Sequence, residues 1–148
     1  GYGTAGQHSD NPYPYFIHAG VKCVLPSTPY DAKGLLAAAI RDDDPVAIFP
    51  QAQLLGMRGE VPEEPYAIPL GVGEIKRQGT DVTIAATGVM VHHALSAAEQ
   101  LQAEGISVEV YDPRTLYPLD KAMLLESVAK TGRLVVCDDA NRTCGFAA

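Results

Sequence analysis

The start of the chain carries a histidine in a setting that suits proton transfer. His8 lies in the stretch GTAGQHSDNP, between Gln7 and Ser9, with glycines close by. Imidazole can donate or accept a proton near neutral pH, and glycines let the backbone approach a bound ligand closely. The residues alone fit either a catalytic histidine or an incidental one in a glycine-rich loop.

The other three histidines show no pattern that points to chemistry. His18 follows the aromatic run YFI and is predicted to be a packing position. His92 and His93 fall in the first turns of a predicted helix. Adjacent side chains on a helix point about 100° apart, and neither has a ligand partner four residues away, so a metal site is not expected.

Composition narrows the class of protein. The 148 residues are 47% hydrophobic and 20% charged, enough for one ordinary core or for one small core plus part of another. A formal charge of −7, with acids spread along the chain, argues against nucleic acid as a partner. No apolar run approaches the roughly 18 residues of a membrane span, and no signal peptide is indicated. Cys23, Cys137 and Cys144 are odd in number and far apart, which favours reduced thiols over a disulfide framework or a zinc site.

The first fifty residues predict a strand, a helix and a second strand. Residues 21–25 (VKCVL) and 46–49 (VAIF) are short β-rich runs. Between them, residues 27–43 predict a helix with Thr28 as its N-cap and Pro29 at its first position. Two parallel strands do not make a stable sheet, so further strands are expected as neighbours.

Residues 51–73 interrupt this pattern and predict a linker, because they contain several prolines and little apolar periodicity. Strand and helix signals then alternate to the end of the chain, with a turn expected after Pro113. The expected strands lie in residues 74–77, 82–86, 106–112 and 133–139, and the expected helices in residues 89–104 and 120–130. Strands separated by helices imply right-handed crossovers, so we predict an α/β fold of parallel sheets with helices on both faces.

The two ends of the chain look like cuts in a longer polypeptide. The last residues, NRTCGFAA, stop where a helix after the final strand is expected to begin. The first half lacks the strands that its own two strands need as neighbours. We therefore expect a piece of a longer chain, with a small complete domain as the alternative.

Several motifs resemble one family in their order and spacing. They are GQHS, VLPSTPYDAKGLLAAAIRDDDPV, GEVPEEPYAIPLG, GTDVTI, SVEVYDPRTLYPLD and KTGRLVVCDDANRTCGF. Together they resemble the β subunit of the thiamine-diphosphate-dependent decarboxylating component of 2-oxo acid dehydrogenases, in the transketolase-like superfamily. Its members act on pyruvate, branched-chain 2-oxo acids or acetoin, and the resemblance runs from Gly6 to Phe146. Transketolases and deoxyxylulose-phosphate synthases share the architecture but match these motifs less well.

The resemblance implies an organisation and a role for His8. Residues 1–50 correspond to the C-terminal part of a pyrimidine-binding domain, 51–73 to a linker, and 74–148 to a transketolase C-terminal-type domain truncated at its end. In such enzymes the loop that matches GQHS faces the reacting carbon of the cofactor, so His8 is the expected catalytic residue. The diphosphate, its magnesium and the aminopyrimidine are held by residues outside this chain.

The resemblance also implies a structural potassium ion at the end of the helix in residues 27–43. The matching ligands are the carbonyls of Ala39 and Asp42 and an oxygen of Asp44. Carbonyls freed at a helix end are suitable ligands for such a cation. A solvated loop is the alternative for this segment.

Two departures from the family pattern bear on the site. After GQHS the family usually has an acid at the position of Tyr13, and it commonly has an acid followed by a basic stretch where this chain has Pro50 and Gln51. Two functions are therefore carried forward. One is part of an enzyme that decarboxylates a 2-oxo acid and passes the acyl group to a lipoyl carrier, and the other is a non-catalytic assembly module.

The enzyme hypothesis implies partners and a compartment. The expected partners are an α subunit, a second β subunit and a lipoyl acyltransferase core, in the cytoplasm or the mitochondrial matrix. The isolated chain is expected to be inactive, and the resemblance does not distinguish among the 2-oxo acids.

Overall fold

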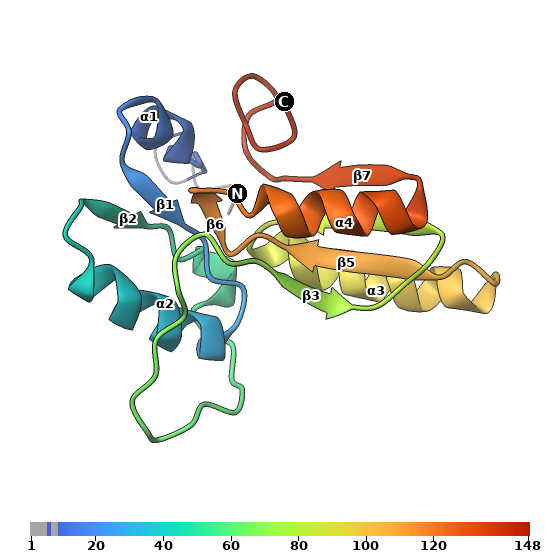
Figure 1. Ribbon diagram of the computed structural model, residues 1–148, viewed down its shortest axis with the longest axis horizontal. Coiled ribbons are helices and arrows are strands. Elements are labelled where there is room, and N and C mark those ends of the chain that lie inside the picture. Colours follow the sequence, from blue (N-terminus) through green and yellow to red (C-terminus); the bar gives the residue numbers. More distant parts are fainter. Residues whose placement is uncertain (1–5, 7–8) are drawn as a thin grey trace.

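Sheet A joins two strands of the first fifty residues to a strand from much later in the chain. The computed structural model describes residue 6 and residues 9–148, and sheet A has the strand order β2-β1-β6. β1 (Lys22–Val24) pairs in parallel with β2 (Val46–Ile48) and antiparallel with β6 (Thr115–Tyr117). Figure 1 shows β6 beside β1, near the centre of the view. The sequence predicted only a turn here, because three residues are too few to show a strand pattern.

Two helices cover opposite faces of sheet A. They are α1 (Tyr13–His18) and α2 (Pro29–Arg41), above and below the sheet in Figure 1. Cys23 packs in a cluster with Tyr13 on the α1 side. The next residue, Val24, packs with Leu35 of α2. This alternation follows from the two-residue period of a strand.

Local capping sets the start of α2 where the sequence predicts it, whereas the helix ends at Arg41, two residues before the end of the predicted segment. The hydroxyl of Thr28 accepts a hydrogen bond from the Asp31 backbone N–H at 3.0 Å, and Pro29 occupies the first helical position. Asp42 ends the helix with an extended backbone conformation. The predicted N-cap is therefore confirmed.

The segment 51–73 lies against α2. It contains one short 3₁₀ helix, η2 (Ala52–Leu54). Farther along, the Ile68 N–H donates to the Gly34 carbonyl at 3.0 Å. A Cβ at Gly34 would lie 2.6 Å from an Ile68 side-chain atom, so glycine permits this close contact. The division of the chain at residues 51–73 stays a prediction.

Sheet B contains the strands of the second half in the order β3-β5-β4-β7. They are β3 (Glu74–Arg77), β4 (Val82–Ala86), β5 (Val108–Asp112) and β7 (Leu134–Cys137). β4 pairs in parallel with both β5 and β7, as expected, whereas β3 is antiparallel to β5. A tight connection from β3 to β4, with no crossover helix, accounts for this difference in direction.

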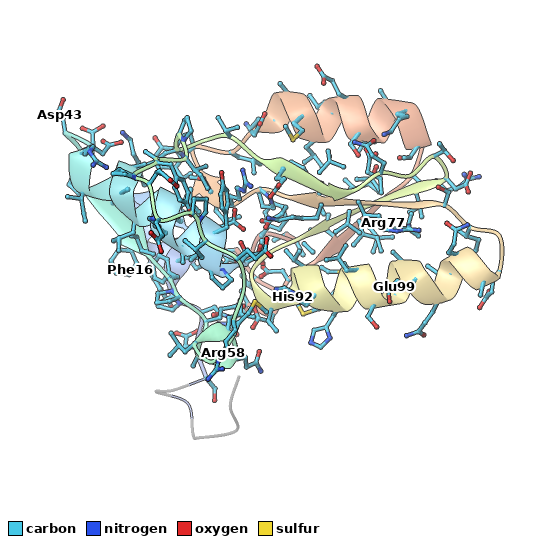
Figure 2. The ribbon with its side chains drawn as sticks, turned by 90° about the horizontal axis from the view of Figure 1, so that it is seen from below. Phe16, Asp43, Arg58, Arg77, His92 and Glu99 are labelled. Carbon is cyan, nitrogen blue, oxygen red and sulfur yellow. The ribbon has the colours of Figure 1, made fainter. Side chains whose placement is uncertain are left out.

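Helices lie on both faces of sheet B, which confirms the α/β class. They are α3 (Val89–Ala103) and α4 (Lys121–Thr131), and Figure 2 shows the sheet between them. α4 begins with the Asp120 carboxylate accepting from the Met123 N–H at 3.1 Å, and it ends at Gly132 in a left-handed conformation. Within the described residues, no helix has the length and apolar character needed to cross a bilayer.

Candidate active site

A cleft of about 250 Å³ lies at the carboxyl ends of β2 and β7. Residues 9–12 form one wall, residues 48–53 form the other, and Asp139 reaches in from the end of β7. In open α/β sheets, ligands bind outside the carboxyl ends of the strands, so the position fits a binding site. His8 directly precedes the first wall but lies outside the described residues.

The wall of residues 9–12 leads into a buried tyrosine. Tyr13 is only 2% exposed, and its hydroxyl donates to the Asp138 carboxylate at 2.5 Å. The Phe146 N–H donates to the Tyr13 hydroxyl oxygen at 2.7 Å. Burial and the hydrogen bond to Asp138 raise the pKa of Tyr13 well above its ordinary value, so the phenol stays protonated. Tyr13 is therefore buried directly after one wall of the cleft and is not among the residues that line it.

Gln51 links the second wall to sheet B and α3. Its side-chain amide donates to the Asp139 carboxylate at 2.9 Å, and its carbonyl oxygen accepts from the Val89 N–H at 2.5 Å. Gly88 precedes α3 with a φ of 50°, and a Cβ there would lie 2.2 Å from the same Gln51 oxygen. Glycine at this position is therefore required for the contact.

The described lining does not fit a diphosphate with its magnesium. Its charged residues are Asp10 and Asp139, both acidic, and it contains no Lys or Arg. Within residue 6 and residues 9–148, no cluster of three or more His, Cys, Asp or Glu side chains could hold a metal ion. The cleft can supply a wall and polar groups, but a diphosphate would need cations from elsewhere.

Ala39, Asp42 and Asp44 lie at the end of α2, where Lys22 pairs with the two aspartates. The Asp42 N–H donates to the Ala39 carbonyl at 3.4 Å. Lys22 Nζ lies 2.7 Å from the Asp42 carboxylate and 2.9 Å from that of Asp44. The hydrogen bond from Lys22 lowers the pKa of Asp42, and the Asp44 N–H adds to this effect. The Lys22 ammonium group thus pairs with the carboxylates of Asp42 and Asp44, and the predicted potassium site stays a prediction.

Sequence reasoning gave no role to a buried charge cluster between the two sheets, which we term the junction network. Its members are Ser27, Asp31, Glu74, Lys76, Asp112 and Arg114. Asp31 and Asp112 are fully buried. The motifs PSTPYDAKGLL and DPRTLYPLD, which carried the resemblance, supply four of these residues.

Asp31, at the start of α2, holds the centre of the junction network. One carboxylate oxygen accepts from Lys76 Nζ at 2.8 Å, and the other lies 2.9 Å from Arg114 Nε. Burial alone would raise the pKa of Asp31, but the hydrogen bonds from Lys76 and Thr28 and the positive charges of Lys76 and Arg114 together hold the pKa below its ordinary value. Asp31 is therefore a charged group that ties α2 to the second half of the chain.

Asp112 responds differently to the same environment. Burial raises its pKa to about 6, although the hydrogen bond from Ser27 at 2.5 Å opposes the shift. The folded state therefore binds a proton more tightly at Asp112 than the unfolded state does. Stability contributed by this group is present below its unfolded pKa of 3.8 and is lost as pH rises towards 6.

Asp112→Asn tests this dependence, because asparagine does not titrate. Relative to the original chain, the variant should gain on the order of 3 kcal/mol in unfolding free energy between about pH 4 and about pH 7. Urea unfolding of both chains across this range measures the difference. Parallel stability profiles for the two chains would contradict the raised pKa.

The remaining histidines take no part in the cleft. His92 Nε2 lies 2.8 Å from the Ser27 carbonyl oxygen, and Figure 2 shows it at the end of α3 nearest to α2. His93 is exposed, as is His18, for which the packing prediction is wrong. His18 lies in the last turn of the short helix α1, whose buried residue is Tyr13.

Comparisons with known proteins place these features in a family. The family described as "Transketolase, C-terminal domain" matches residues 71–148. Acetoin:2,6-dichlorophenolindophenol oxidoreductase subunit beta of Cupriavidus necator is 54% identical over 99% of this chain and 44% of its own length. Pyruvate dehydrogenase E1 component subunit beta of Bacillus subtilis is 52% identical over 87% of the chain and 40% of its own length.

A solved transketolase structure is also similar to this chain. A split-gene transketolase, titled an inactive beta4 tetramer, is 30% identical with a TM-score of 0.73, over 85% of this chain and 41% of its own. The chain therefore spans less than half the length of the proteins that it matches.

Proposed function

We propose that this chain, which belongs to the transketolase C-terminal domain family, is part of the β subunit of a thiamine-diphosphate-dependent 2-oxo acid dehydrogenase. In the proposed reaction a 2-oxo acid loses carbon dioxide and the acyl group passes to a lipoyl carrier. The observation that carries the proposal is 52% identity, over 87% of the chain, to a pyruvate dehydrogenase E1 component subunit beta. Tyr13, one departure from the family pattern, is bonded to Asp138 and lies outside the lining of the cleft.

His8 is the residue to which we assign proton transfer. It precedes the wall of residues 9–12, and imidazole can hold or release a proton near neutral pH. Thiamine diphosphate, when bound, would act as an electron sink for the carbon that loses carbon dioxide. Because the described lining carries no cation, we assign the diphosphate and magnesium to an α subunit. We also place a second β subunit, a lipoyl acyltransferase core and a cytoplasmic or mitochondrial-matrix location in the proposal.

The proposed domain division follows from the same assignment. Residues 1–50 would belong to a pyrimidine-binding domain and residues 74–148 to a transketolase C-terminal-type domain, with 51–73 as the linker. The main-chain oxygens of Ala39 and Asp42 and an oxygen of Asp44 would hold a potassium ion. Lys22 already pairs with the two carboxylates, so the carbonyls are the ligands that remain for the ion.

Acetoin is a second candidate substrate, because a relative with 54% identity is named for it. Assays of the full-length subunit with its α partner should measure carbon dioxide release from pyruvate and branched-chain 2-oxo acids, and acceptor reduction with acetoin. Activity with a 2-oxo acid supports the first assignment, and activity with acetoin alone supports the second. An assembled complex that is inactive with all of them supports the non-catalytic assembly module.

The isolated chain should not bind thiamine diphosphate tightly. The cleft offers two carboxylates and no cation to a diphosphate, and like charges in one site repel. Calorimetry with thiamine diphosphate and magnesium should detect no binding stronger than about millimolar. Micromolar binding by the chain alone would place the diphosphate site within these residues and overturn the assignment to a partner.

A further inference from the structure

β7 ends in two neighbouring carboxylates whose side chains contact different walls of the cleft. Asp138 accepts from the Tyr13 hydroxyl at 2.5 Å, and Asp139 accepts from the Gln51 amide at 2.9 Å. Tyr13 directly follows the wall of residues 9–12, and Gln51 belongs to the wall of residues 48–53. Both contacts cross from sheet B to the first half of the chain.

Asp138 is held by hydrogen bonds on both of its oxygens. Oδ2 accepts from Tyr13 and also from the Phe146 N–H at 2.7 Å. Oδ1 accepts from the Ala140 N–H at 3.2 Å and from the Thr87 hydroxyl at 3.4 Å. Three hydrogen bonds other than the one from Tyr13 therefore hold the Asp138 carboxylate in place. Hydrogen bonds to a charged acceptor are roughly twice as strong as those between neutral groups.

Asp139 accepts a hydrogen bond from the Gln51 side chain, whose carbonyl oxygen is also hydrogen-bonded. The Gln51 carbonyl oxygen accepts from the Val89 N–H at the start of α3, so both ends of the amide are bonded to the second half of the chain. Gln51 follows β2 by three residues, on the side where the cleft opens. Its bonds thus restrict where the end of β2 can lie.

We propose that Asp138 and Asp139 are positioning residues that hold the two walls of the cleft at a fixed separation. In this way the residues that follow β7 would set the geometry of the cleft in which the proposed reaction takes place. The catalytic consequence rests on the proposed function, whereas the effect on the walls does not.

Hydrogen exchange of the whole chain tests the effect on the walls. Tyr13→Phe removes the hydroxyl that bonds Asp138 and the Phe146 N–H while keeping the ring packed, and Gln51→Glu places a second carboxylate against Asp139. We expect about tenfold faster exchange in residues 9–17 for the first variant and in residues 50–54 for the second. Amides of β4 and β5 should keep their original rates in both variants.

A paired substitution provides the rescue. In Gln51→Glu with Asp139→Asn, donor and acceptor exchange places, so exchange in residues 50–54 should return to within about twofold of the original rate. The control is Glu99→Gln on the exposed surface of α3, which should change no segment. Unchanged rates in both walls, or a uniform rise over the whole chain, would overturn the proposal.

Kinetics of the assembled full-length enzyme test the catalytic consequence. Gln51→Glu should lower kcat by about tenfold with little change in KM, and the paired substitution should restore it, because a misplaced wall affects the reacting geometry. An inactive original enzyme would refute the proposed function. In that case hydrogen exchange alone would decide whether Asp138 and Asp139 hold the two walls of the cleft. An active original enzyme with an equally active Gln51→Glu variant would refute positioning.

Discussion

Replacing Arg114 with methionine should lower the unfolding free energy of the chain by about 3 kcal/mol, the scale observed when one partner of a buried ion pair is removed. Arg114 is 8% exposed, and its Nε lies 2.9 Å from a carboxylate oxygen of the fully buried Asp31. Methionine keeps much of the volume but leaves that oxygen without its cation. Urea unfolding at neutral pH, followed by circular dichroism, measures the loss.

Two further variants separate the ion pair from other effects of the substitution. Arg58→Met alters an exposed arginine for which the described residues provide no side-chain hydrogen bond or ion pair, and it should change stability by less than about 0.5 kcal/mol. Adding Asp31→Asn to Arg114→Met should recover part of the loss, since the uncompensated charge is then removed. Additive losses from Asp31→Asn and Arg114→Met would show that the pair is not coupled.

The sequence predicted the starts of two helices well but predicted the pairings of two strands poorly. The starts of α2 and α4 depend on the capping residues directly before each helix, Thr28 and Asp120, and both caps are present. β6 depends on β1, which lies far away in the sequence, and no local pattern announces that pairing. The antiparallel direction of β3 could not be predicted either, because the alternation of polar and apolar residues along a strand indicates which face is buried but not which strand lies beside it.

The candidate site divides in the same way. His8 could be selected only through the family resemblance, because its glycine-rich setting alone fits either a catalytic or an incidental histidine. Gln51 and Asp139 could not, since they are 88 residues apart and meet only in the fold. A usable signal was present in the two carboxylates directly after the strand LVVC, because polar residues at the carboxyl end of a strand face the edge where ligands bind.

Replacing His8 with alanine in the full-length subunit, assembled with its partner, should lower turnover by roughly 100-fold or more, the usual scale for the loss of a general acid or base. Folding and assembly should be preserved, because an alanine in a glycine-rich stretch removes no large apolar side chain. His8→Asn should be nearly as damaging, since an amide keeps a similar shape but cannot exchange a proton near neutral pH.

The distribution of the His8→Ala loss distinguishes acyl transfer from cofactor binding. Lipoyl acylation should fall more strongly than affinity for thiamine diphosphate, because the groups assigned to the diphosphate lie outside this chain. His93→Ala is the matched control, since His93 is exposed on α3 and belongs to neither wall of the cleft. If His8→Ala keeps the original turnover in an active complex, His8 is an ordinary loop residue and proton transfer must come from another group. If the original complex assembles but has no activity, the chain serves as an assembly module instead.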